Sequence, residues 1–181
     1  KKIINRIVKP TFKAISEIGE SYTGFLYVGL MIKKNEPYLV EYNVRMGDPE
    51  CQTILPLLET DLLELMLACC EENLEKKIVQ WKNKKSICIV LCSKGYPDTY
   101  KKNLEIPNLK KINSNENTFI YHAGTALYKN KVYATGGRVL NFVSISDNLK
   151  KARNSAIKEI KNLSWENGFY RSDIGFRIID K

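Results

Sequence analysis

YLVEYNVRMGDPE, at residues 38–50, alternates polar and apolar side chains from Val40 to Met46. Successive side chains of a β-strand point to opposite faces, so the pattern predicts a strand over 38–46. One face would be apolar (Val40, Tyr42, Val44 and Met46) and the other polar (Glu41, Asn43 and Arg45). Neighbours on one face lie about 6.5–7 Å apart.

The polar face suits a cation and an anion held side by side. Oxygens of Glu41 and Asn43 can converge on one hard cation, while the Arg45 guanidinium points at an anion beside it. Mg²⁺ prefers oxygen ligands at about 2.0–2.1 Å and commonly shares them with substrate phosphates. The alternation alone is more often that of an ordinary edge strand with one solvated face.

The four residues after this strand, Gly47-Asp48-Pro49-Glu50, have the composition of a helix start. Gly47 permits a tight bend. We expect Asp48 to be the N-cap and Pro49 the first helical residue. A helix N-terminus presents free N–H groups and a positive dipole, which favours an anion site beside the polar strand face.

The chain carries a net charge of +9 over 181 residues, most of it from lysine. Nucleic-acid-binding proteins tend to concentrate such charge on one stripe with interleaved aromatic residues. Here the lysine pairs fall mostly at expected loops and element ends, which favours solvated lysine over a nucleic-acid-binding module. A positive field also suits a phosphorylated substrate.

The cysteine pattern indicates a reducing compartment. The five cysteines form no CxxC pair and the chain has one histidine, which argues against a zinc site or a disulfide framework. We therefore expect a cytoplasmic protein. No apolar run approaches the ~18–20 residues of a membrane span, so no membrane is expected as a partner. The first residue is lysine within a helical pattern, so we expect a piece of a longer polypeptide.

The first half predicts helices around a hairpin. Residues 1–20 have helical spacing interrupted by Pro10, and Gly19 is the expected stop. Residues 24–32 form a buried strand that pairs with 38–46. Thr60 is the expected cap of a helix with Leu62, Leu65, Met66, Cys69 and Cys70 on its apolar face. The polar segment 71–83 is the expected linker.

The second half predicts strands followed by a helix. Strands are expected at 86–92, 119–127 and 132–145, with a loop over 110–117. The Gly136-Gly137 pair inside the last strand indicates a bulge or a close backbone approach. Asp147 is expected to cap a helix through Leu163, with Leu149, Ala152, Ala156, Ile157 and Ile160 facing inward. The segment 168–179 is expected to be irregular or a strand.

Six stretches in order carry a resemblance to one family. They are LYVGLMI (26–32), VEYNVRMGDPECQTILPLL (40–58), SKGYP (93–97), HAGTAL (122–127), GGRVL (136–140) and GFYRSDIGFR (168–177). The series resembles the phosphoribosylamine–glycine ligases, also called glycinamide ribonucleotide synthetases, which belong to the ATP-grasp enzymes. A strand with a polar face like that of residues 38–46 is common to many ATP-grasp ligases. GDPE (47–50) followed by the downstream series is far more specific.

The resemblance implies an α+β fold. Residues 1–83 would be the carboxy-terminal part of an ATP-grasp domain, with an antiparallel sheet and helices, and residues 84–181 a small mixed β/α carboxy-terminal domain. It also implies a purine-biosynthetic ligase. Glycine is activated by ATP as glycyl phosphate and 5-phosphoribosylamine then attacks, which yields glycinamide ribonucleotide, ADP and phosphate.

The resemblance also assigns roles to residues. Glu41 and Asn43 match the ligands of Mg²⁺ or Mn²⁺, and Arg45 matches a basic residue that steadies the transferring phosphoryl group. Asp48 and Glu50 are candidates for the glycine pocket, although capping alone explains Asp48. Lys94 and Arg138 either contact the sugar phosphate or are an ordinary surface lysine and a bulge residue.

Two further features are expected to be structural. His122 lies in an apolar strand, where a lone histidine is more often structural than catalytic. Arg171, Asp173 and Arg177 are expected to form an ion-pair network that fixes the tail.

The chain also departs from the family. The amino-terminal domain, the phosphate-covering glycine-rich loop and the nucleotide-steadying lysine have no counterpart in these residues, so the missing amino-terminal part is the expected partner. We therefore expect the segment alone to be catalytically incompetent. The other enzyme considered is another ATP-grasp ligase, such as a biotin carboxylase relative. Those relatives place a glutamate–histidine pair after a similar strand, and residues 47–50 contain no histidine.

Overall fold

The computed structural model describes residues 1–112 and 115–179, which form two compact units. Unit 1 contains residues 1–48 and 60–80, and unit 2 contains residues 49–59 and the described residues from 81 onward. All the strand pairs are antiparallel, which confirms the expected α+β class with antiparallel sheets. The assignment of domains to 1–83 and 84–181 stays a prediction.

Unit 1 begins with a helix that changes its winding near Pro10. A π-helical turn, η1 (Ile4–Val8), leads directly into α1 (Lys9–Glu17). Pro10 therefore lies in the first turn of α1, where its missing N–H is tolerated. The helix ends before Gly19, whose φ of +82° is left-handed. The stop predicted for 1–20 is confirmed. The interruption at Pro10 is limited to this change of winding, because helical residues continue from Ile4 to Glu17.

The central hairpin of unit 1 pairs β1 (Tyr27–Lys33) with β2 (Glu36–Asn43). Lys34 and Asn35, with φ of 50° and 62°, form the tight turn. The predicted strand over 38–46 is too long at its carboxyl end, because β2 ends at Asn43 and the chain bends at the next two residues. Its predicted apolar face is mostly exposed, with Val40 65% accessible.

The next helix of unit 1 is α3 (Leu62–Cys70), whose N-cap lies one residue after the predicted cap, Thr60. Asp61 is the N-cap, and its carboxylate accepts hydrogen bonds from the backbone N–H groups of Leu63 and Glu64. The Thr60 hydroxyl instead binds the backbone of residues 78 and 80. The predicted apolar face of α3 is confirmed, because its five residues line one hollow of about 360 Å³. The short helix η3 (Leu74–Lys76) follows.

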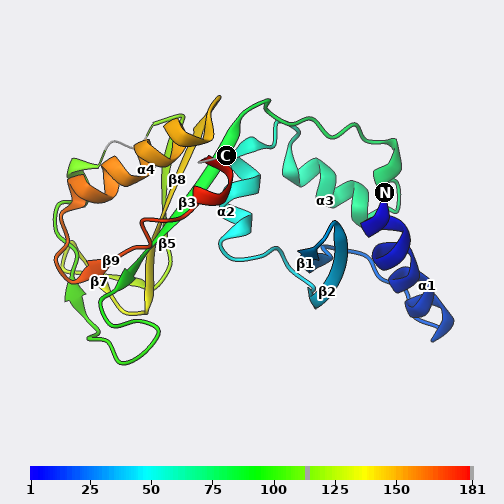
Figure 1. Ribbon diagram of the computed structural model, residues 1–181, viewed down its shortest axis with the longest axis horizontal. Helices are drawn as coiled ribbons and strands as arrows, with labels where there is room; N and C mark the ends of the chain where they lie inside the picture. Colours follow the sequence, from blue (N-terminus) through cyan, green and yellow to red (C-terminus); the bar gives the residue numbers. More distant parts are fainter. Residues whose placement is uncertain (113–114, 180–181) are drawn as a thin grey trace. The chain divides into compact units, whose positions relative to one another are not determined.

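Unit 2 is built on a four-stranded sheet with α4 (Leu149–Leu163) across one face (Figure 1). The sheet order is β5 (Thr118–His122), β8 (Arg138–Ser146), β3 (Lys85–Ser93) and β9 (Gly168–Phe169). Alternate residues of β3 and β8 pack with α4 in the main core, which includes Ile89, Leu91, Leu140, Phe142, Ala156, Ile160 and Leu163. Asn148 caps α4, so the expectation for Asp147 was wrong by one residue.

A second, three-stranded sheet joins β4 (Leu104–Glu105), β7 (Lys131–Ala134) and β6 (Thr125–Tyr128). The predicted strands 119–127 and 132–145 are each broken in two, because the chain passes from one sheet to the other at residues 123–124 and 135–137.

The short elements of unit 2 complete the described chain. They are α2 (Glu50–Ile54), η2 (Leu55–Leu57), η4 (Leu109–Lys111) and α5 (Phe176–Ile179). The predicted loop over 110–117 contains η4's end, and its residues 113–114 lie outside the described part of the chain. Among the described residues, no helix has the length and apolar character needed to cross a membrane.

Candidate functional site

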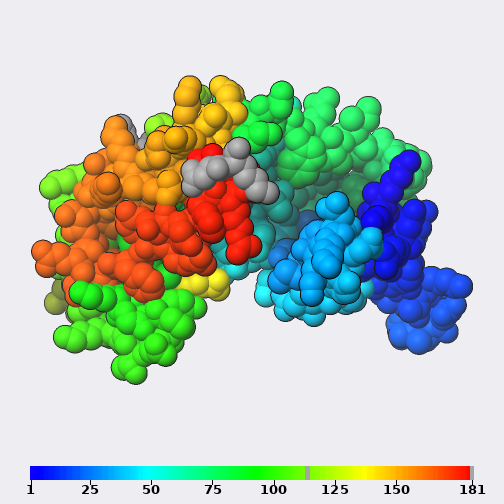
Figure 2. Space-filling view, viewed as in Figure 1, coloured from blue at the N-terminus to red at the C-terminus, as the bar shows by residue number. Residues whose placement is uncertain are grey.

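The end of β2 places two oxygen-bearing side chains next to each other. Asn43 Nδ2 donates a hydrogen bond to Glu41 Oε1 at 3.0 Å, so the prediction that Glu41 and Asn43 share one strand face is confirmed. Glu41 is exposed and Asn43 is half-buried. The hairpin that carries them lies on the surface in light blue in Figure 2.

This pair fits part of the ligand set of a hard divalent cation. Rotating the Asn43 amide presents its oxygen beside the Glu41 carboxylate, which gives two oxygen donors of the kind Mg²⁺ and Mn²⁺ prefer. The described residues contain no cluster of three or more His, Cys, Asp or Glu side chains suited to a metal. A cation here would therefore take further ligands from phosphates or water.

Arg45 does not share the strand face predicted for it. β2 ends at Asn43, and Arg45 lies in the following bend, exposed, with Nη1 donating to the Met46 carbonyl oxygen at 2.9 Å. The strand period stops applying once the ladder ends, so alternation misplaces this side chain. Arg45 remains two residues beyond Asn43 in the chain, on a segment less constrained than a strand.

The residues after the bend also differ from expectation. Pro49, not Asp48, is the N-cap of α2, and it provides no side-chain cap hydrogen bond. Asp48 lies in an exposed turn, and Glu50 is the half-buried first residue of the five-residue helix. Because Asp48 belongs to unit 1 and Glu50 to unit 2, a helix end beside the polar strand stays a prediction.

In unit 2, three of the motifs meet at the glycine pair. The Ser93 N–H donates to the Gly137 carbonyl at 2.7 Å, and the buried Ser93 hydroxyl donates to the Gly136 carbonyl at 2.8 Å. A Cβ on Gly124 would lie 2.6 Å from the Gly136 Cα. The close backbone approach predicted for Gly136 and Gly137 is therefore confirmed, and it joins SKGYP, HAGTAL and GGRVL.

Lys94 and Arg138 lie beside this junction. Lys94 follows Ser93 and Arg138 follows Gly137, the two residues joined by the backbone hydrogen bond. Both side chains are exposed. Lys94 lines a hollow of about 430 Å³ together with Thr99, Tyr100, Lys101, Leu104 and Asn167. Two amines and two hydroxyl groups around one hollow suit an anionic, hydroxyl-bearing ligand.

A second hollow of unit 2, of about 380 Å³, brings residues of three motifs together. Pro49, Tyr96 and Arg171 line it, with Cys88, Val90 and Cys92 along one face of β3. Burial raises the pKa of the Cys92 thiol more than the neighbouring Arg138 guanidinium lowers it. The thiol therefore stays protonated near neutral pH and contributes an apolar wall.

The tail residues form a pair, not the expected network of three. The Arg171 guanidinium donates to both carboxylate oxygens of Asp173, at 3.1 and 2.7 Å. This pairing lowers the pKa of the Asp173 carboxyl and raises that of Arg171. Arg177 instead lies over the Phe176 ring, 5.8 Å from its centroid.

His122 has the contacts of a structural residue. Its Nδ1 lies 2.9 Å from the Thr125 hydroxyl, so it ties the end of β5 to the start of β6. This contact fits the structural role expected for His122.

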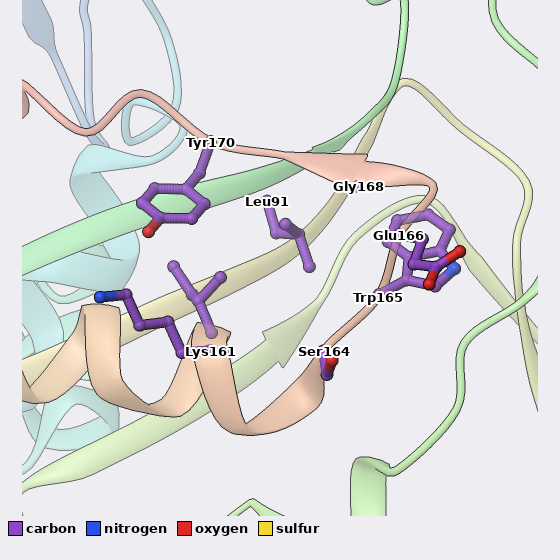
Figure 3. Close-up of a pocket in the computed structure, with 8 residues that line it drawn as sticks. Leu91, Lys161, Ser164, Trp165, Glu166, Gly168 and Tyr170 are labelled. Carbon is purple, nitrogen blue, oxygen red and sulfur yellow. The ribbon is translucent and has the colours of Figure 1, made fainter.

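A smaller cleft of about 210 Å³ lies where α4 ends against β9 (Figure 3). Leu91 and Ile160 belong to the core beneath it, and the Trp165 indole N–H donates to the Glu105 carbonyl at 2.9 Å. A Cβ on Gly168 would lie 2.5 Å from the Trp165 ring. The cleft contains none of the predicted site residues and is explained by this packing.

Comparison with known proteins identifies the class and then the family. Residues 1–51 match the sequence model for "Phosphoribosylglycinamide synthetase, ATP-grasp (A) domain", which is the part that carries Glu41 and Asn43. Residues 86–177 match that for "Phosphoribosylglycinamide synthetase, C domain". The fold and the matched segments are thus those of an ATP-grasp protein. The chain belongs to the phosphoribosylglycinamide synthetase family.

Individual relatives agree with this assignment. A phosphoribosylamine–glycine ligase from Caldanaerobacter subterraneus subsp. tengcongensis is 43% identical over 96% of this chain and 41% of its own length. A bifunctional purine biosynthetic protein from Dictyostelium discoideum is 38% identical over 99% of this chain and 23% of its own length.

A solved structure supports the fold. The phosphoribosylamine–glycine ligase of Thermotoga maritima superposes with a TM-score of 0.80 and 31% identity, over 95% of this chain and 42% of that one. The chain thus spans about two fifths of the single-function ligases it matches.

Proposed function

We propose that this chain forms part of an ATP-dependent ligase that joins glycine to 5-phosphoribosylamine in purine biosynthesis. The observation that carries the proposal is the Glu41–Asn43 pair at 3.0 Å on a hairpin inside the segment that matches the ATP-grasp domain. The products would be glycinamide ribonucleotide, ADP and phosphate. The compartment expected from the free cysteines, a reducing cytoplasm, stays a prediction.

In the proposed reaction the glycine carboxylate takes the γ-phosphoryl group of ATP, which releases ADP and leaves glycyl phosphate. The amine of phosphoribosylamine then attacks the carbonyl carbon and phosphate leaves. Phosphoryl transfer of this kind depends mainly on positioning and on stabilising charge. Bound Mg²⁺ or Mn²⁺ would neutralise charge on the ATP phosphates.

The residues of unit 1 would orient and hold these groups. Glu41 and Asn43 would hold the cation through one carboxylate and one amide oxygen. Arg45, exposed on the bend after β2, would place its guanidinium against the transferring phosphoryl group. Nη1 donates to the adjacent Met46 carbonyl oxygen, and the guanidinium has further N–H groups that can donate to an anion.

The remaining predicted residues have narrower roles. Lys94, which lines a hollow with Lys101, would bind the sugar phosphate. Arg138, which follows the residue bonded to Ser93, would be a further cation near Lys94.

Either Asp48 or Glu50 would border the glycine site, where a carboxylate can accept hydrogen bonds from the substrate ammonium group. The hollow of about 380 Å³ in unit 2 is lined by Pro49, which precedes Glu50 in the chain. This hollow supports a glycine site near Glu50.

The test uses a polypeptide that carries these 181 residues together with the other regions found in the relatives. ADP release should require both glycine and phosphoribosylamine, and should require a divalent cation. ADP release that does not depend on glycine would overturn the proposed acceptor, and activity in the presence of a chelator would overturn the metal role.

A further inference from the structure

We infer that Gly29 is a positioning residue for the cation ligand Glu41, an inference that rests on the proposed function. Gly29 lies directly opposite Glu41 in the β1–β2 ladder. It belongs to the other strand of the hairpin and carries no side chain, so its contribution is the space above its Cα.

The ladder is irregular at this position. Gly29 pairs with Glu41, whereas the next residue, Leu30, pairs with Leu39, so Val40 is an extra residue on β2. A bulge of this kind bends the strand and redirects the side chains beside it. The irregularity therefore falls immediately before Glu41 and sets the direction of its side chain.

The space above Gly29 is filled by Glu41 itself. A Cβ on Gly29 would lie 3.0 Å from Glu41 Cγ, 3.4 Å from the Glu41 carbonyl oxygen and 3.6 Å from Tyr27 Cε1. The nearest atom is the methylene that carries the carboxylate. A methyl group at Gly29 would displace this methylene and move the carboxylate with it.

The backbone of Gly29 does not itself demand glycine. Its φ lies outside the left-handed region, unlike that of Gly19 or Gly24. Alanine can adopt the same backbone conformation without strain. The requirement at Gly29 is therefore room for the Glu41 side chain, which separates a positioning role from a conformational one.

Displacing the carboxylate would disrupt the pair of ligands. Glu41 Oε1 accepts the Asn43 amide at 3.0 Å, and a shift of a few tenths of an ångström changes the distance between the two oxygen donors. Mg²⁺ requires nearly ideal octahedral geometry. Substitution of residues that orient metal ligands typically weakens metal binding about 10–100-fold.

The test compares Gly29→Ala with Val28→Ile in the polypeptide that carries all regions found in the relatives. Val28→Ile adds one methyl group to the adjacent residue, which pairs with Tyr42 and points to the opposite face. Gly29→Ala should raise the Mg²⁺ concentration for half-maximal activity about 10–100-fold, while Val28→Ile should not. Thermal unfolding of both variants should stay close to that of the unsubstituted protein.

A binding measurement and a double variant complete the test. Water-proton relaxation of Mn²⁺–ATP should report weaker binding to Gly29→Ala, independently of turnover. The effect of Gly29→Ala should vanish in the Glu41→Gln background, because residues in contact are non-additive. A loss of activity that is equal at all metal concentrations, or an unaltered metal dependence, would overturn the role of Gly29. If Glu41→Gln itself left the metal dependence unaltered, the metal assignment of the proposed function would fail as well.

Discussion

At the scale of single residues, the end of β2 separates two kinds of function. Glu41 and Asn43 are held by the ladder, and their side chains meet at 3.0 Å. Arg45 lies beyond the ladder on an exposed bend. A ligand in a strand suits a cation that needs fixed geometry, whereas a guanidinium on a bend can follow a group that moves during transfer.

The substitution Arg45→Ala tests this second role. We expect turnover to fall about 10²–10³-fold, the range for loss of one charge-stabilising donor, with a much smaller change in the KM for ATP. Steady-state kinetics with ATP as the varied substrate measure both. Arg6→Ala removes an exposed guanidinium of the same unit that is already paired with Glu36 and is the matched control. A rate unaltered by Arg45→Ala would contradict the assignment.

Lys94→Ala tests the sugar-phosphate site. Lys94 lines a hollow beside Lys101, and removing a charge-assisted contact of about 1.5–3 kcal/mol should raise the KM for phosphoribosylamine about 10–100-fold. The KM for ATP should stay the same. Lys102→Ala is the control, because Lys102 is an exposed lysine next to Lys101 in the chain. An equal effect of the two substitutions would indicate a general field of positive charge instead of a specific site.

The two misplaced caps of α3 and α4 have a common physical cause. Thr60-Asp61 and Asp147-Asn148 each offer two good capping residues in succession, and composition cannot choose between them. Which of the two residues becomes the N-cap depends on whether the first of them is already hydrogen-bonded elsewhere. Thr60 is already bound to the backbone of residues 78 and 80, so Asp61 caps α3. That contact spans about twenty residues and leaves no local signal.

At the scale of elements, the cap of α4 can be tested directly. The Asn148 side chain accepts hydrogen bonds from the N–H groups of Lys150 and Lys151 at 2.8 and 3.2 Å. Asn148→Ala should lower the free energy of unfolding by about 1 kcal/mol, measured by urea denaturation. Asp147→Ala should change it by less than about 0.5 kcal/mol. The reverse order would restore the assignment made from sequence.

The contact between the first helix and the hairpin should depend on pH. Lys2 and Arg6 both donate to the Glu36 carboxylate and lower its pKa. A carboxyl whose folded pKa is lowered stabilises the fold above its unfolded pKa, and this stabilisation is lost as pH falls through the folded value. The groups are exposed, so the effect should be small.

Glu36→Gln should therefore lower the unfolding temperature slightly at pH 7 and have no effect in acid well below the ordinary pKa of glutamate. Glu17→Gln, which removes a looser pair with Lys13 at 3.6 Å, is the control. Circular dichroism melts across the pH range measure the difference. A difference that persists unaltered in acid would rule out this ion pair as its cause.

The elements themselves were predicted better than their ends. Period-two alternation located β2, and the apolar positions of α3 and α4 agree with the hollow and the core that they face. The breaks that divide 119–127 and 132–145 were not predicted. They occur where Gly124 and Gly136 approach each other. These positions are twelve residues apart, and the local sequence of neither strand indicates the contact.

At the scale of the whole molecule, the candidate residues fall into two separate groups, one in each unit. Glu41, Asn43 and Arg45 belong to unit 1, whereas Glu50, Lys94 and Arg138 belong to unit 2. The sequence could assign these residues through resemblance because the motifs occur in a fixed order. Local pattern alone supported only the pair on β2, since the other residues acquire their neighbours through backbone contacts far apart in the chain.

The division bears on what the 181 residues can do alone. We expect no ligase activity from the isolated chain, although both units should fold. Phosphoryl transfer needs the phosphates surrounded by positioned positive charge and shielded from water. The described residues of unit 1 instead offer two oxygen-bearing side chains on the hairpin and one guanidinium on the exposed bend after it. The sequence also contains no glycine-rich phosphate loop.

The measurement is ADP release with saturating ATP, glycine, phosphoribosylamine and Mn²⁺. The isolated chain should match a protein-free blank, and the polypeptide with all regions found in the relatives should be active under the same conditions. Circular dichroism and a cooperative thermal transition verify that the isolated chain is folded, so that inactivity cannot be attributed to unfolding. Release that requires both glycine and phosphoribosylamine would show that the 181 residues suffice for the reaction and would refute this prediction.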